Sequence, residues 1–201
     1  MIVEKFEDNW SWLEARRGKI TGSRLADVIT KRGTGYKVGV YELIAEKLGI
    51  SADGEDERER GHRLEPEAIE RLIKETSIPF KTEKVLWKRE EDEDIALSPD
   101  AFTEDLTVAG EAKCLSSAKH IKALIEQKVP EDYEYQALQY FIVNERLEKL
   151  YFCFYDPRLY TKDFFYLVIT REEKLEEIDE YLAYEAKLLA FVREQVNAFT
   201  F

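Results

Sequence analysis

The chain has 201 residues, enough to bury one ordinary hydrophobic core, and its 44% hydrophobic and 12% aromatic content excludes intrinsic disorder. Its apolar runs are too short to cross a bilayer and its first residues lack a signal-peptide pattern, so we expect a cytoplasmic protein without a membrane partner. The two cysteines are expected to be free thiols, which leaves oxygen atoms as the ligands of any metal ion.

The net charge of −12 at first argues against a nucleic-acid partner, because such proteins usually present a basic surface. The charge is unevenly distributed, however. Residues 15–41 contain seven basic residues and one acidic residue, and this local +6 leaves −18 for the rest of the chain. A basic segment on an acidic body suits a protein that meets a polyanion along one face. Solvated charge on a helix surface is the alternative explanation.

The N-terminal part of the chain is predicted to be helical. Apolar spacing and capping residues predict four helices, at residues 9–17, 21–29, 41–48 and 58–76. The second of these is opened by the segment Thr21-Gly22-Ser23. A basic loop with two glycines, residues 31–37, follows it.

The middle of the chain changes to strand-like patterns. Short runs rich in β-branched or aromatic residues predict strands at residues 80–88, 95–98, 107–115, 150–155 and 164–169. Further helices are predicted at residues 116–128, 131–144 and 172–197. This order predicts an α/β (α+β) fold with one mixed sheet, in a single domain that spans residues 1–201.

Chemically informative residues gather on two neighbouring predicted strands. Asp100 lies at the end of one strand, and Glu111 and Lys113 lie two residues apart on the next. Residues i and i+2 of a strand point to the same face, and a short hairpin can return the chain beside Asp100. The sequence therefore predicts that two carboxylates and one ammonium group converge in one site.

Such a set suits phosphodiester hydrolysis. Carboxylate oxygens are the ligands that Mg²⁺ prefers, and a bound divalent ion polarises a phosphate and lowers the pKa of a bound water. Lys113 can orient the attacking water and offset charge in the transition state. Other Glu-x-Lys triplets fall in predicted helices, where solvated charge is the default, at residues 126–128, 172–174 and 185–187. For Glu111 and Lys113 the alternative is a structural ion pair.

Four short blocks follow one another in a recognisable order. They are residues 12–23, residues 61–68, the segment 98–100 with 111–114, and residues 135–140 leading to 155–158. With these blocks the chain resembles the PD-(D/E)xK nucleases, and within them the phage lambda-type exonuclease (viral recombinase) family. The resemblance implies a restriction-endonuclease-like core, a central mixed β-sheet flanked by helices. Two positions depart from the family pattern, since Ala101 replaces a usual glycine and Ala112 a usual branched residue.

The resemblance implies a role for each residue of the site. Asp100 and Glu111 correspond to metal ligands, together with the backbone carbonyl of Ala112, and Lys113 corresponds to the catalytic lysine. Glu65 corresponds to a fourth catalytic group, a helix carboxylate that faces a metal ion, although an exposed glutamate is the alternative. The implied cofactor is Mg²⁺, with Mn²⁺ as an alternative, at two ions per site.

The same resemblance implies the DNA contacts. Arg16, Ser23 and Gln136 fall where the family holds the 5′-terminal phosphate, and Lys119 falls where it can contact a backbone phosphate. A helix N-terminus and an arginine are good phosphate ligands, but a capping serine, a surface arginine and a surface amide are the ordinary alternatives. Gly61 is expected to allow a close approach of a strand or of the substrate.

The implied activity is that of a 5′-to-3′ exonuclease that degrades one strand of double-stranded DNA and leaves a 3′ single strand for recombination by annealing. The implied partners are duplex DNA with a 5′-phosphorylated end and a single-strand annealing protein. A homotrimeric ring in which only the lining is basic would reconcile this activity with the acidic composition. The implied origin is a phage, a prophage or a bacterium. The alternatives are a restriction or repair endonuclease on the same core, and a catalytically inactive DNA-binding or assembly module.

Overall fold

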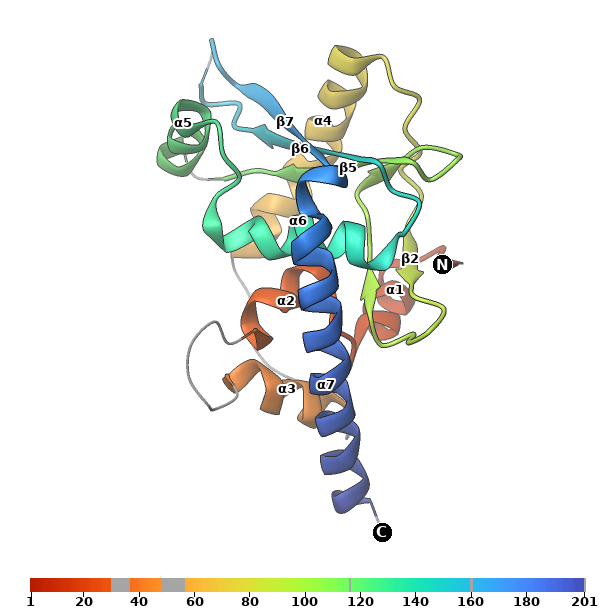
Figure 1. Cartoon of the computed structure of the whole chain (residues 1–201). Coiled ribbons are helices and arrows are strands. Elements are labelled where there is room, and N and C mark those ends of the chain that lie inside the picture. The colour runs from red at the N-terminus through yellow and green to blue at the C-terminus, as the bar shows by residue number, and fades with distance from the viewer. Residues whose placement is uncertain (30–36, 48–56, 116, 160, 201) are drawn as a thin grey trace.

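A computed structural model gives the fold for residues 1–29, 37–47, 57–115, 117–159 and 161–200. At its centre lies a four-stranded mixed sheet in the order β4-β5-β6-β7 (Figure 1). Its strands are β4 (Ala101–Phe102), β5 (Val108–Lys113), β6 (Lys149–Tyr155) and β7 (Phe164–Thr170). β5 and β6 are parallel, and the other two pairs are antiparallel. The predicted α/β fold with a central mixed sheet is confirmed.

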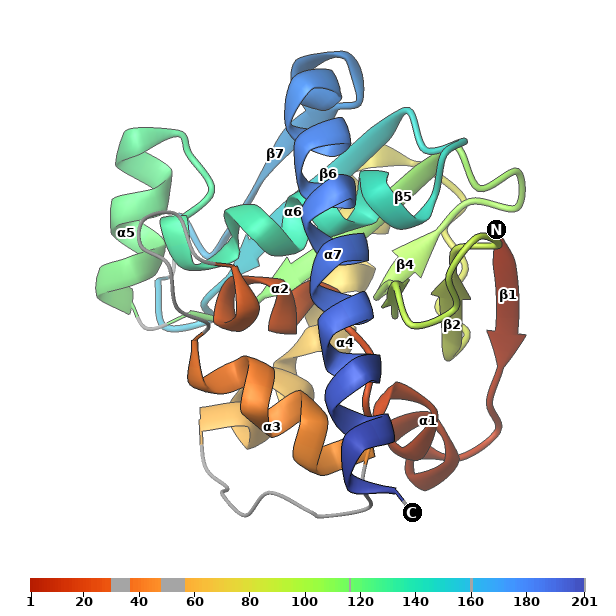
Figure 2. The same cartoon turned by 60° about the horizontal axis from the view of Figure 1, so that its bottom comes forward.

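Helices cover both faces of this sheet. They are α4 (Glu57–Thr76) on one face, α6 (Glu131–Val143) on the other, and α7 (Leu175–Phe199), which crosses over α6 (Figures 1 and 2). Side chains alternate along β5, so Ala112 packs toward α4 whereas Glu111 contacts α6. A Cβ on Gly110 would lie 2.9 Å from the Leu72 side chain of α4. The glycine therefore lets α4 approach closely the strand that carries Glu111.

Three further strands form a second, antiparallel sheet in the order β1-β2-β3, so the prediction of a single sheet is wrong. These strands are β1 (Ile2–Lys5), β2 (Val85–Lys88) and β3 (Ala96–Leu97). The sequence does not predict β1, because four residues give little periodicity and the strand forms only by pairing with β2. The strand predicted at residues 80–88 begins only at Val85, and Lys81 instead bridges to Phe102 at the edge of the central sheet.

The other helices agree with their predictions to within a few residues. They are α1 (Asn9–Arg16), α2 (Gly22–Val28), α3 (Val38–Lys47) and α5 (Ser117–Glu126), with a 3₁₀ turn at Glu172–Lys174 before α7. α2 packs against α6, and α3 packs against α7. Of the basic loop predicted at residues 31–37, only Lys37 is among the described residues.

Both cysteines are free thiols, as predicted. Cys153 is buried in β6, and Cys114, which follows β5, is half-buried. None of the described helices combines the length and the apolar character needed to span a membrane.

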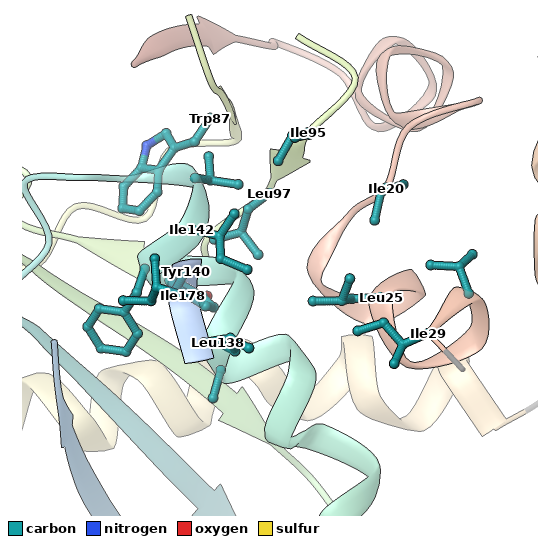
Figure 3. Close-up of a cluster of buried hydrophobic side chains, with 14 of the residues drawn as sticks. Ile20, Leu25, Ile29, Trp87, Ile95, Leu97, Leu138, Tyr140, Ile142 and Ile178 are labelled. Atoms are coloured by element: carbon teal, nitrogen blue, oxygen red, sulfur yellow. The ribbon is translucent and has the colours of Figure 1, made fainter. Parts of the chain in front are cut away.

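α6 forms the middle of the hydrophobic core. Its last seven residues, 137–143, are all buried, which is expected of a helix enclosed between a sheet and other helices. The Trp87 ring meets the rings of Phe102 and Tyr140 edge-on, at centroid separations of 5.7 and 6.3 Å. Figure 3 shows Tyr140 in one cluster with Leu97 and Trp87. This packing fixes α6, and with it the side chains that α6 directs toward β5.

Glu185 on α7 does not carry the solvated charge expected of a helical Glu-x-Lys triplet. It is fully buried, and its two carboxyl oxygens have no hydrogen-bond partner among the described residues. It lies against the buried Gln139, whose amide donates to the Ile20 carbonyl at 3.2 Å and whose Oε1 is also unpartnered. Burial raises the pKa of Glu185 well above its ordinary range. A protonated Glu185 can donate to Gln139 and so join α7 to α6.

We expect the Glu185→Gln variant to be more stable than the parent chain at neutral pH. The folded chain keeps a proton on Glu185 that the unfolded chain loses, so this group's contribution to the free energy of unfolding falls as pH rises from the unfolded pKa toward the folded one. Glutamine has no proton to lose, and its amide can donate to Gln139. Melting temperatures should therefore coincide near about pH 4 and diverge toward about pH 8, with the variant higher.

The matched control is Glu180→Gln, which changes an exposed glutamate of the same helix. It should follow the parent chain at every pH. If the difference in melting temperature between the parent chain and Glu185→Gln did not change with pH, Glu185 would be charged in the folded protein.

Candidate active site

The antiparallel pairing of β4 with β5 brings Asp100 beside Glu111. Ala101 pairs with Gly110, so the next position outward sets Asp100 against Glu111. The Asp100 Oδ2 atom accepts a hydrogen bond from the Ala112 N–H at 2.8 Å. The turn between the strands therefore returns the chain as the sequence predicts. Ala101 lies in β4 with ordinary extended backbone, so no glycine is required there.

Glu111 and Lys113 project from the same face of β5. Lys113 Nζ lies 2.6 Å from Glu111 Oε1, and it also lies over the Tyr133 ring at 5.0 Å from the ring centroid. Burial acts to lower the pKa of Lys113, but the Glu111 and Asp100 carboxylates outweigh it and raise that pKa above its ordinary value. Lys113 is therefore an ammonium ion at neutral pH.

Two side chains of α6 donate hydrogen bonds to the Glu111 carboxylate. Gln136 Nε2 donates to Glu111 Oε1 at 2.5 Å, and the Tyr140 hydroxyl donates to Glu111 Oε2. Gln136 and Tyr140 are four residues apart and so lie on one face of the helix. Glu111 is only 2% exposed, and a carboxylate at that depth requires such donors. Tyr140 was not predicted as a site residue, although its spacing of four residues from Gln136 indicates that both lie on one face of the helix.

Glu65 on α4 completes an acidic group around Lys113. Its side chain is 38% exposed, and His62 Nδ1 lies 3.7 Å from Glu65 Oε2. Burial and the nearby Glu111 charge raise the pKa of Glu65. Burial, Glu111 and Glu65 together raise the pKa of Asp100 well above its ordinary range. The three carboxylates therefore repel one another, and the structure brings all four predicted groups into one neighbourhood.

The donor set fits a hard divalent cation, although the described residues contain no three acidic, histidine or cysteine side chains already closed around an ion position. Lys113, Gln136 and Tyr140 all donate hydrogen bonds to the Glu111 carboxylate. Asp100 Oδ1 accepts no hydrogen bond from the described residues. Once all three carboxyl groups are ionised, they and the Lys113 ammonium carry an excess of two negative charges. Oxygen ligands with that excess are what Mg²⁺ or Mn²⁺ requires.

The residues predicted to bind the terminal phosphate lie on α1, α2 and α6, and Gln136 of α6 contacts the Glu111 carboxylate. Arg16 ends α1, and Gly22 of α2 packs so closely on α6 that a Cβ there would lie 3.1 Å from Gln136 Cγ. Ser23 follows Gly22 in α2, but the residue that caps this helix is Thr21, so Ser23 does not open it. The Gln136 amide contacts Glu111 and is not a simple surface amide.

Two other predicted positions lie on α5 and α4. Lys119 on α5 is exposed, and its Nζ lies 3.8 Å from an Asp132 carboxylate oxygen. Gly61 on α4 has no described atom within 4 Å of the place where a Cβ would be, so no described strand approaches it closely, and a close approach of the substrate stays a prediction. Lys31 and Arg32 lie outside the described residues.

Three solved structures that are similar to this chain are exonucleases. The alkaline exonuclease of Laribacter hongkongensis superposes with a TM-score of 0.81 at 27% identity, over 95% of this chain and 96% of that one. The same enzyme in complex with dAMP gives a TM-score of 0.78 at 29% identity, over 94% and 97%. A phage-related exonuclease from Haemophilus somnus 129PT, at 16% identity, shares the fold with a TM-score of 0.60 over 90% and 96%.

No curated protein sequence matches the chain. The model of the YqaJ-like viral recombinase domain matches residues 11–146, which is more than half of the chain and includes Glu65, Asp100, Glu111 and Lys113. The chain therefore belongs to the family of YqaJ-like viral recombinase domains.

Proposed function

We propose that the chain is a metal-dependent exonuclease that degrades the 5′-ended strand of duplex DNA and leaves a 3′ single strand. The observation that carries the proposal is the convergence of Asp100, Glu111 and Lys113 where β4 meets β5, with Glu65 opposite. The exonuclease activity of the Laribacter enzyme and its complex with a deoxynucleotide support a DNA substrate.

In this mechanism Asp100, Glu111, Glu65 and the Ala112 carbonyl would hold the divalent cation. Mg²⁺ or Mn²⁺ bound there, at two ions per site, would supply Lewis acidity toward the scissile phosphate. Gln136 and Tyr140 fix the orientation of the Glu111 carboxylate before substrate binds, so little reorganisation is required.

Lys113 acts as a cation in this proposal. The two flanking carboxylates keep its proton in place, so it stabilises negative charge on the phosphate oxygens and does not accept a proton from water. Its contact with the Tyr133 ring favours the charged form as well.

The preference for a DNA end belongs to the same proposal. Arg16, Ser23 and Gln136 would bind a 5′-terminal phosphate, and Lys119 would contact the backbone. The chain would act as a single nuclease domain over residues 1–201, in a homotrimeric ring, and pass its 3′ strand to an annealing protein in the cytoplasm. A ring with a basic lining is compatible with a net charge of −12, because only the lining meets DNA.

The function is tested with linear and covalently closed circular duplex DNA, each incubated with Mg²⁺ or with a chelator. We expect the 5′-ended strand of the linear duplex to be released as nucleotides only with Mg²⁺, and the circle to survive. Linearisation of the circle would instead indicate an endonuclease. No DNA loss with either Mg²⁺ or Mn²⁺ would indicate an inactive binding module.

A further inference from the structure

One tryptophan of α1 connects an arginine to the segment that leads into Asp100. Trp12 Nε1 donates to Ser98 Oγ at 3.0 Å, and Ser98 lies two residues before Asp100. The Arg16 guanidinium lies over the Trp12 ring, with its Cζ 4.4 Å from the ring centroid. Lys84 Nζ lies 6.0 Å from the same centroid. The indole therefore has a polar contact toward the carboxylates and cationic contacts on its ring.

We propose that Trp12 is a positioning residue that holds Arg16 at a fixed place relative to Asp100 and so sets the preference for a 5′-phosphorylated end. The inference rests on the proposed function, because the 5′ phosphate is the ligand of Arg16. An arginine at the end of a surface helix samples many rotamers. Stacking on a ring restricts them, so less conformational entropy is lost when the phosphate binds.

The stacked geometry is compatible with phosphate binding. Stacking uses the flat face of the guanidinium, whereas a phosphate is bound through the N–H groups at its edge. The hydrogen bond from Trp12 Nε1 to Ser98 joins the indole that carries the guanidinium to the segment that leads into Asp100. Trp12 thus links the guanidinium that would bind the terminal phosphate to the segment that leads into Asp100.

The neighbouring Trp10 supplies a comparison on the same helix. It is 71% exposed, whereas Trp12 is half-buried and makes the contacts described above. A merely structural Trp12 would tie α1 to the body of the protein and affect all substrates alike. A positioning Trp12 affects the phosphorylated end alone, because only that end uses Arg16.

The test compares initial rates on linear duplexes that differ only in a 5′ phosphate or 5′ hydroxyl, at saturating Mg²⁺. The parent chain should prefer the phosphate. Trp12→Leu should lower the ratio of the two rates roughly fivefold, mainly through slower cleavage of the phosphorylated end. Arg16→Ala should lower the ratio at least as far, and adding Trp12→Leu to Arg16→Ala should lower it no further. Trp10→Leu should leave the ratio unchanged.

Trp12→Phe keeps a ring beneath Arg16 and lacks the N–H, so it covers the case in which Trp12→Leu fails to fold. It should retain a larger ratio than Arg16→Ala, with an intermediate loss. Equal losses on both ends in either Trp12 variant, or additive losses in the double variant, would overturn the positioning role while leaving the exonuclease in place. A parent chain without any preference would overturn the 5′-phosphate site itself, and the Trp12 assignment with it.

Discussion

Replacement of Lys113 by alanine is expected to lower the rate of DNA cleavage by roughly 1000-fold, because it removes the ammonium group that is proposed to stabilise negative charge on the phosphate oxygens. Lys113 Nζ lies 2.6 Å from Glu111, and its ammonium form is stabilised by Glu111 and Asp100. Binding of duplex DNA should change little, since the proposed metal and phosphate contacts remain. Cleavage is measured by release of acid-soluble nucleotides, and binding by fluorescence anisotropy with Ca²⁺ in place of Mg²⁺.

The substitution also removes a partner from the buried Glu111, so folding must be measured alongside activity. We expect a lower melting temperature in chelator that Mg²⁺ partly restores. Lys113→Gln keeps a donor for Glu111 without the charge, and should fold better yet remain as inactive. Lys149→Ala is the matched control, because it alters an exposed lysine on the adjacent strand β6. Turnover by Lys113→Gln near the parent rate would refute the role of the cation.

The regular parts of the fold can be predicted from the sequence, and the short ones cannot. Helices such as α4 and α6 carry enough turns for periodicity to show. β4 has two residues, Ala101 and Phe102, and β1 has four, so both are defined by their pairing partners and not by their own pattern. The second sheet depends on bringing residues 2–5 beside residues 85–88, which no local signal encodes.

Some contacts of the candidate site can likewise be predicted from local sequence patterns, and others cannot. The alternation of a strand predicts that Glu111 and Lys113 share a face, and the hairpin predicts the place of Asp100. Tyr140 contacts Glu111 because α6 packs across the sheet, and this tertiary packing cannot be predicted from the local sequence. The burial of Glu185 could have been predicted from its position, because helical spacing places it on the apolar face of α7 with Ile178, Leu189 and Val192.

Asp100→Asn is expected to abolish cleavage and at the same time to stabilise the metal-free protein. Asn keeps an oxygen for the Ala112 N–H but loses the negative charge that a divalent ion requires. In the parent chain burial, Glu111 and Glu65 raise the pKa of Asp100, so the contribution of Asp100 to stability falls as pH rises above the pKa of the unfolded chain, about 3.9. Removing that charge relieves the repulsion at neutral pH.

The effect of Asp100→Asn on the melting temperature should therefore depend on whether Mg²⁺ is bound. In chelator at about pH 8, Asp100→Asn should melt above the parent chain, whereas with excess Mg²⁺ the parent chain should gain stability and the variant should not. Asp179→Asn on α7, which alters an exposed carboxylate, should behave as the parent chain in both conditions. An Asp100→Asn variant that still gains stability with Mg²⁺ would show that the cation is held without Asp100. The negative charge of Asp100 causes both the repulsion among the carboxylates without a cation and the affinity for the cation. The variant, which lacks this charge, should therefore lose the repulsion and the affinity together.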